Sequence, residues 1–204
     1  MITKQQAETF FGNTISGKQL DDLNACLVEY GIDKTKARLN HFLAQIAHES
    51  GGLKWMQELA SGADYEWRAD LGNTQAGDGR KYKGAGAIQL TGRANYQAFS
   101  TYIKDARVME GHTYVSQVYP FTSAGFWWYR NKMNALCDKG GTVEDVTLVV
   151  NGWYNGLEER TKYYFKAVEM FKNIDTPFKT FTPVPTPTRP AIPALINEIF
   201  SLGQ

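Results

Sequence analysis

The sequence predicts a mainly helical protein with one glycine-rich, loop-dominated region and a small hairpin. Apolar residues recur at the three- and four-residue spacing of helices on both sides of residues 61–92. Residues 61–92 themselves contain many glycines together with Asp, Asn and Thr, and they show little periodicity. The chain has 204 residues, and its 43% hydrophobic content is enough to bury the core of one domain.

The first two helical patterns are separated by Gly31, Ile32 and Asp33. Their apolar faces consist of Leu20, Leu23, Leu27 and Val28 in the first pattern, and of Leu39, Phe42, Leu43, Ile46 and Ala47 in the second. This spacing predicts helices at about 19–30 and about 34–50. Gly51 and Gly52 then predict the end of the second helix.

After the loop region, helical spacing returns at about 94–105, 121–137, 143–150 and 157–172. We expect Trp127, Trp128 and Trp153 to lie in or near the core. Six of the seven prolines fall in residues 177–193, which predicts an extended segment, and a short amphipathic segment follows. We therefore expect a main domain at 1–176 and an extension at 177–204. The extension has few cations, so we expect it to dock on the domain rather than on a membrane.

Charge and cysteine content exclude several classes of protein. The 22 Lys and Arg nearly balance the 21 Asp and Glu, which argues against a generic nucleic-acid binder. Cys26 and Cys137 could pair, but two buried free thiols are favoured. The start of the chain lacks the apolar core of a secretory signal, and no apolar run reaches membrane-spanning length, so we expect synthesis in the cytoplasm. His41 and His48 stand about 10 Å apart on a helix, so we expect no metal site and no cofactor.

Two glutamates flank the predicted glycine stop. Glu49 shares a helical stripe with Phe42 and Ile46, where partial burial and the negative end of the helix dipole favour a protonated carboxyl, as a general acid requires. Glu58 follows the glycine turn and could face Glu49 across a cleft as a base. A separation of about 6.5–9.5 Å would imply inversion at the sugar carbon, and about 5–5.5 Å retention. Rivals for the second acid are Glu66, Asp64, Asp70 and Asp78.

Longer stretches resemble a known family. "HFLAQIAHESGG", "YKGAGAIQLTGRANYQAF", "FTSAGFWWYRNKMNALCD" and "VNGWYNGLEER" occur in the order typical of family 19 glycoside hydrolases, over roughly residues 38–165. This family includes plant-type chitinases and, more similar still, endolysins of tailed phages that infect Gram-negative bacteria. The resemblance implies a lysozyme-like α+β catalytic domain, with a helical bundle and a small glycine-rich region beside the catalytic cleft.

The resemblance also implies roles for individual residues in an inverting hydrolysis of β-1,4 links between N-acetylated amino sugars. Glu49 is then the general acid, Glu58 the base, and Thr91 the hydroxyl that holds the attacking water. A wider set is expected to line the sugar site or support the acid, by match to the family or by position near the cleft: Gln89, Asn95, Tyr96, His48, Tyr82, Trp55, Asn151 and Arg160. A cation at Arg160 would lower the pKa of Glu49, whereas burial would raise it, and the sequence does not show which effect is larger.

The leading hypothesis from the sequence is an endolysin that cuts the peptidoglycan glycan strand in a muramidase-like reaction. We expect it to act in the periplasm as a monomer, without stable membrane insertion, after release by a holin-type partner that only analogy suggests. The alternatives are a chitinase, a lytic transglycosylase and an inactive peptidoglycan-binding protein. The last is suggested by Gly84-Ala85-Gly86, where the family commonly has Gly-Arg-Gly.

Overall fold

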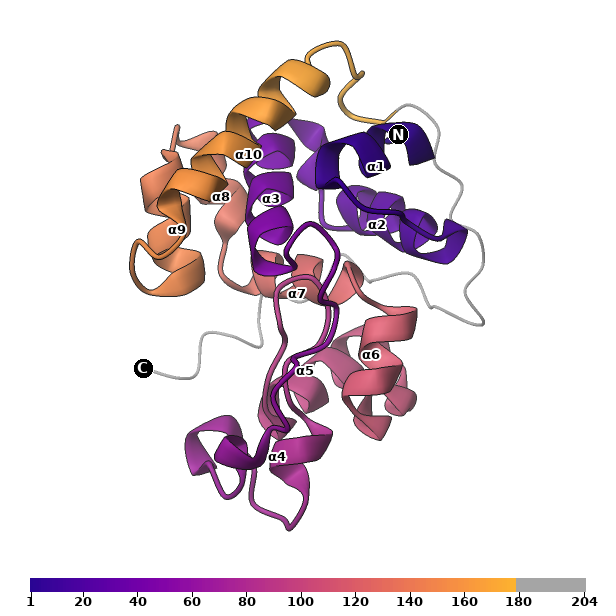
Figure 1. Cartoon of the computed structure of the whole chain (residues 1–204), viewed down its shortest axis with the longest axis vertical. Helices are drawn as coiled ribbons and strands as arrows, with labels where there is room; N and C mark the ends of the chain where they lie inside the picture. Colours follow the sequence, from indigo (N-terminus) through magenta and orange to yellow (C-terminus); the bar gives the residue numbers. More distant parts are fainter. Residues whose placement is uncertain (179–204) are drawn as a thin grey trace.

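The computed structural model describes residues 1–178, and their architecture is mainly helical, as predicted. Figure 1 shows an upper group of helices, a lower group, and α7 between them. The upper group consists of α1 (Lys4–Phe11), α2 (Gly17–Glu29), α3 (Lys36–Glu49), α8 (Met133–Asp138), α9 (Val143–Asn151) and α10 (Leu157–Met170). The lower group consists of α4 (Asp78–Lys81), α5 (Arg93–Ile103) and α6 (His112–Val118), and α7 spans Thr122–Arg130.

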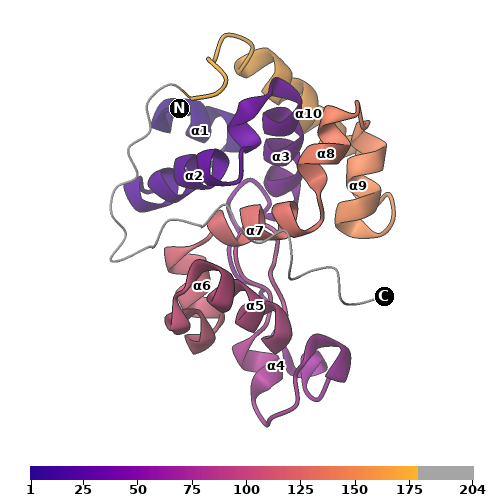
Figure 2. The same ribbon diagram turned by 180° about the vertical axis from the view of Figure 1, so that it is seen from behind.

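Helix α3 is the central element of the upper group. Thr35 caps its first turn by accepting a hydrogen bond from the backbone N–H of Arg38. Every residue from Leu39 to Ala47 is buried, so the helix is covered on all sides rather than on one stripe. Its most extensive partner is α10, which lies beside it in Figure 1 and Figure 2. Functional groups at the end of α3 are therefore carried by a fixed support.

The chain between α3 and α5 forms most of the lower part of the molecule (Figure 1). Besides α4 it contains two short 3-10 turns, Ala63–Tyr65 and Ala69–Leu71. The hairpin expected here is reduced, within the described residues, to two isolated antiparallel bridges that join Ala85 to Gln57 and to Leu90. The glycine-rich composition explains this, because glycine supplies no side chain to stabilise a longer strand.

Several helices differ from the prediction. The helix expected at 121–137 is divided into α7 and α8, because Lys132 adopts a left-handed backbone conformation with φ 55°. Helices α1 and α6 were not predicted, since each is too short to show a full apolar stripe. Elsewhere the predicted helices agree with α2, α3, α5, α9 and α10 to within a few residues at their ends.

The core predictions are largely confirmed. Trp128 is fully buried and Trp127 packs half-buried against the core, but Trp153 is 65% exposed, so its predicted burial is wrong. It lies in the loop between α9 and α10, where no element of residues 1–178 covers it. Cys26 and Cys137 are buried thiols rather than a disulfide, as favoured, and the Cys26 thiol donates to the Phe121 backbone oxygen.

The described chain ends against the domain. Phe178 is buried, and its backbone N–H donates to the Asp33 carboxylate at 2.9 Å. The predicted docking of the C-terminal extension concerns residues that lie almost wholly outside the described part of the chain, so it stays a prediction. Within residues 1–178, no helix has the length and apolar character needed to cross a bilayer.

Candidate active site

Glu49 is the last residue of α3, and its carboxylate is paired with a buried cation. Nη2 of Arg160 lies 2.5 Å from Oε1 of Glu49. The Arg160 side chain is 1% exposed, whereas that of Glu49 is 21% exposed. Nη1 of Arg160 donates to the amide oxygen of Gln45, one turn before Glu49, and Nε donates to the backbone oxygen of Asn155 at 3.2 Å. The guanidinium therefore holds one carboxylate oxygen in place and leaves part of the acid open to solvent.

A second contact between α3 and α10 lies directly beside the first. Nδ1 of His48 is 2.6 Å from Oε2 of Glu159, the residue before Arg160. Gly156, with φ +72°, precedes α10, and a Cβ on it would overlap the His48 ring. Glycine is required here by both its conformation and this close approach. His48 thus joins the end of α3 to the start of α10, and its role in the site stays a prediction.

The turn that follows Glu49 is built by a buried serine as well as by the predicted glycines. The Ser50 hydroxyl donates to the backbone oxygen of Ile46 at 2.6 Å and accepts from the backbone N–H of Leu53 at 2.9 Å. The backbone N–H of Trp55 donates to the Ser50 oxygen at 2.9 Å. The chain therefore reverses within a few residues and runs on toward Glu58.

Glu58 is held by two hydrogen-bond donors, one at each carboxylate oxygen. The Tyr65 hydroxyl donates to Oε1 at 2.9 Å, and the backbone N–H of Gly84 donates to Oε2 at 2.9 Å. The backbone N–H of Glu58 in turn donates to the Gly84 oxygen at 2.9 Å. Burial, and then this contact with Glu58, raise the pKa of Tyr65, so its hydroxyl keeps its proton and remains a donor. The carboxylate is fixed in orientation and only half-buried.

The segment with Gln89, Thr91 and Asn95 lies against the chain that carries Glu58. Nε2 of Gln89 donates to the backbone oxygen of Trp55 at 3.2 Å, which connects this segment to the chain between the two glutamates. The Thr91 hydroxyl donates to the Gln89 backbone oxygen at 2.8 Å, and Nδ2 of Asn95 donates to the Thr91 oxygen at 2.8 Å. With its own proton engaged, the Thr91 hydroxyl oxygen can accept a hydrogen bond from a water molecule.

Two predicted sugar-binding residues are corrected. Tyr82 is 1% exposed and Tyr96 is fully buried, so neither ring can stack on a sugar. Tyr96 shares the inner face of α5 with Phe99 and Ile103 at helical spacing, and its hydroxyl donates to the Lys83 backbone oxygen at 2.7 Å. Two other predicted residues are accessible to a sugar. Trp55 is 42% exposed, and Asn151 is exposed at the end of α9.

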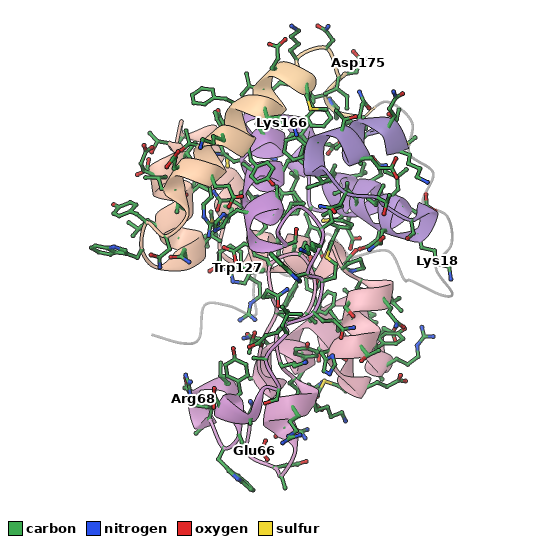
Figure 3. The ribbon with its side chains drawn as sticks, in the orientation of Figure 1. Lys18, Glu66, Arg68, Trp127, Lys166 and Asp175 are labelled. Atoms are coloured by element: carbon green, nitrogen blue, oxygen red, sulfur yellow. The ribbon has the colours of Figure 1, made fainter. Side chains whose placement is uncertain are left out.

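The rival acids have structural partners instead. Glu66 accepts hydrogen bonds from the backbone N–H groups of Gly77 and Gly79, and Figure 3 shows it at the far lower end of the molecule. Asp78 is buried and paired with Arg93, and that guanidinium lowers the pKa of the Asp78 carboxyl. Asp70 is paired with Arg68. Asp64 is exposed in the turn Ala63–Tyr65, where its charge contributes to raising the pKa of Tyr65. Glu58 is therefore the best candidate for the second acid.

Sequence reasoning missed three supporting residues: Tyr65, Gln45 and Glu159. Tyr65 lies in a loop without periodicity, so no pattern connects it to Glu58. Gln45 stands one turn before Glu49, so helical spacing could have indicated it. Glu159 contacts His48 across 111 positions, and no local pattern indicates that contact. Within residues 1–178, no group of three or more His, Cys, Asp and Glu side chains is arranged to hold a metal ion.

Comparison with known proteins identifies the family. No family model matches the chain. A glycosyl hydrolase family 19 domain-containing protein of Haemophilus influenzae is 30% identical over 154 residues, and the match covers 60% of this chain and 74% of that protein. The chain belongs to glycosyl hydrolase family 19. The presence of this domain makes the protein a glycoside hydrolase.

Solved structures agree with the fold of this family 19 hydrolase. Chitinase C from Streptomyces griseus matches with a TM-score of 0.64 and 20% identity, over 86% of this chain and 78% of that one. A class IV family 19 chitinase from Zea mays matches with a TM-score of 0.65 and 19% identity, over 88% of this chain and 97% of that one. The predicted lysozyme-like, mainly helical architecture is thereby confirmed.

Proposed function

We propose that this family 19 hydrolase is an endolysin that cuts β-1,4 glycosidic bonds of the peptidoglycan glycan strand by an inverting mechanism. Glu49 protonates the leaving oxygen, and Glu58 accepts a proton from the water that attacks the sugar carbon. The observation that carries this proposal is the difference between the partners of the two carboxylates. Glu49 is paired with a buried guanidinium, whereas Glu58 is oriented by a hydroxyl and a backbone N–H. Different surroundings are the usual way to give two carboxyl groups different roles.

The environment of Glu58 suits a base. A base must be an acceptor held in one orientation, and the donors at its two oxygens, Tyr65 and Gly84, provide this. Thr91 supplies a second acceptor for the water, because its hydroxyl proton is engaged by the Gln89 backbone oxygen. A water held between Glu58 and Thr91 would have one lone pair directed at the sugar.

The environment of Glu49 suits an acid that is held in one position beside the substrate. Arg160 binds Oε1, so we assign Oε2 to the proton that reaches the leaving oxygen. A bound glycan would cover the 21% of the side chain that is exposed and exclude water from the contact between Oε2 and the leaving oxygen. Arg160 then positions the acid and stabilises its anion after the proton has left.

Analysis of digestion products tests the proposal. Purified peptidoglycan and N-acetylglucosamine oligomers are digested in parallel, and the products are identified by mass spectrometry. We expect peptidoglycan fragments with reducing muramic acid ends, the product of hydrolysis. Glu49→Gln and Glu58→Gln should each lose nearly all product. Full activity of either folded variant would contradict the role of that glutamate. Anhydro-sugar ends would indicate a transglycosylase instead, and binding without soluble products an inactive wall-binding protein.

A chitinase is the second candidate, because the structural neighbours of this chain are named as chitinases. The same carboxylates would serve both substrates. A rate on N-acetylglucosamine oligomers well above the rate on peptidoglycan would decide for the chitinase. For the endolysin, we propose that the protein acts as a monomer on the cell wall of a Gram-negative host during phage lysis, and that a holin-type partner releases it to the periplasm.

A further inference from the structure

Two neighbouring aromatic side chains are exposed in the loop between α9 and α10. Trp153 is 65% exposed and Tyr154 is 42% exposed, and their ring centroids lie 5.4 Å apart with an interplanar angle of 55°. Exposed Asn151 and Asn155 stand on either side of the pair in the sequence. Large aromatic rings are costly to leave in water, and where they gather on a surface they mark a recognition site.

The loop that carries the rings is anchored at several points. Gly152 closes α9 with φ +77°, and its backbone N–H donates to the Leu148 oxygen at 2.9 Å. At the other end, the backbone N–H of Leu157 donates to the Tyr154 oxygen at 3.2 Å, and Arg160 donates to the Asn155 oxygen. The backbone beneath the rings is therefore held in place, so a ligand would lose little free energy in ordering it.

The same anchors place the rings near the candidate acid. Gly156 lies against the His48 ring, and His48 directly precedes Glu49. Tyr154 is two residues before Gly156, so their Cα atoms are at most about 7 Å apart. Arg160, which binds Asn155, is also the guanidinium that binds Glu49. The aromatic pair and the acid thus share one support.

We propose that Trp153 and Tyr154 form a sugar-stacking subsite for a chain of β-1,4-linked N-acetylated amino sugars that extends beyond the cleaved bond. This rests on the proposed function only for the class of substrate. Ring faces complement the C–H faces of a pyranose, and the flanking asparagine amides can both donate to and accept from its hydroxyl and N-acetyl groups. An anionic lipid surface fits less well, because the exposed acids Glu158 and Glu159 follow the pair.

A binding experiment tests the subsite without hydrolysis. Glu49→Gln protein is sedimented with insoluble peptidoglycan and, separately, with chitin. Adding Trp153→Ala should weaken binding to the preferred polymer by about threefold to tenfold, the range of one aromatic contact, and Tyr154→Ala should weaken it in the same direction. Phe165→Ala is the matched control, because Phe165 on α10 is 63% exposed but lies about 12 Å along the helix from Leu157. Equal binding by the Trp153 and Phe165 variants would overturn the subsite.

Two further arms exclude other occupants and separate this proposal from the proposed function. If the protein binds anionic phospholipid vesicles and Trp153→Ala abolishes that binding, the aromatic pair contacts a lipid and the subsite is overturned. If the protein self-associates in sedimentation velocity and Trp153→Ala abolishes the self-association, the pair contacts a second copy and the subsite is likewise overturned. In the active protein, Trp153→Ala should raise KM for polymer by a larger factor than KM for a trisaccharide, and equal factors would also overturn it. If Glu49→Gln retained activity, the proposed function would fail, while the comparison of KM for polymer and for trisaccharide in the active protein would still decide the subsite.

Discussion

Replacing Arg160 with methionine tests whether the buried guanidinium organises the acid. The variant keeps an unbranched side chain but removes three hydrogen bonds, to Glu49, Gln45 and the Asn155 oxygen. The two neutral acceptors contribute about 1 kcal/mol each and the charged one about 1.5–3 kcal/mol, so the free energy of unfolding should fall by about 3–5 kcal/mol. This loss resembles that for breaking other buried ion pairs.

Urea denaturation followed by tryptophan fluorescence measures this difference, and a double-mutant cycle apportions it. Glu49→Gln and the double variant give the coupling between Glu49 and Arg160, which we expect to be about 1.5–3 kcal/mol, since Arg160 is 1% exposed. A loss below about 1 kcal/mol for Arg160→Met would refute the reasoning, because a buried guanidinium with three acceptors cannot contribute so little.

Three other substitutions probe separate features. Burial lowers the pKa of His41 to about 4, below its ordinary 6.5, so the unfolded chain binds a proton that the folded chain does not. The free energy of unfolding should therefore fall by about 3 kcal/mol as the pH drops from 6.5 to 4. His41→Phe should make the urea midpoint less dependent on pH over that range, and an unchanged dependence would contradict this. Tyr65→Phe should lower kcat by roughly tenfold and shift the acidic limb of the pH profile, because Glu58, the proposed base, loses an orienting donor. A drop in stability alone, with kcat and the profile intact, would make Tyr65 merely structural. Gly156→Ala should lower the free energy of unfolding by about 1–3 kcal/mol, because position 156 has a positive φ and the added Cβ would overlap the His48 ring. A melting temperature equal to that of the parent protein would argue against this close contact.

The sequence was sufficient for the elements that repeat a pattern. The apolar spacing of residues 39–47 predicted α3, and the acid at its end followed from the same stripe. Family motifs then indicated Glu58 and Thr91. Local periodicity could not show which aromatic residues face inward, because Tyr96 belongs both to a motif near the site and to the inner face of α5.

Contacts between distant segments were out of reach for sequence reasoning. The Tyr65 hydroxyl reaches Glu58 across a loop whose backbone oxygens at Ala60 and Tyr65 accept hydrogen bonds from the distant side chains of Lys83 and Asn73. Tryptophan is on average a highly buried residue type, so the residue alone favours burial. The exposure of Trp153 depends on how the described elements pack around its loop. These features depend on tertiary packing, which a single-sequence pattern does not encode.

The pairing between α3 and α10 has a consequence for protein synthesis. Glu49 and Arg160 are separated by 111 positions in the chain. A ribosome therefore completes the acid long before it makes the guanidinium that orients it. A nascent or prematurely terminated chain that ends before α10 lacks Arg160, so the Glu49 carboxylate gains its buried partner only when translation of the domain is nearly finished.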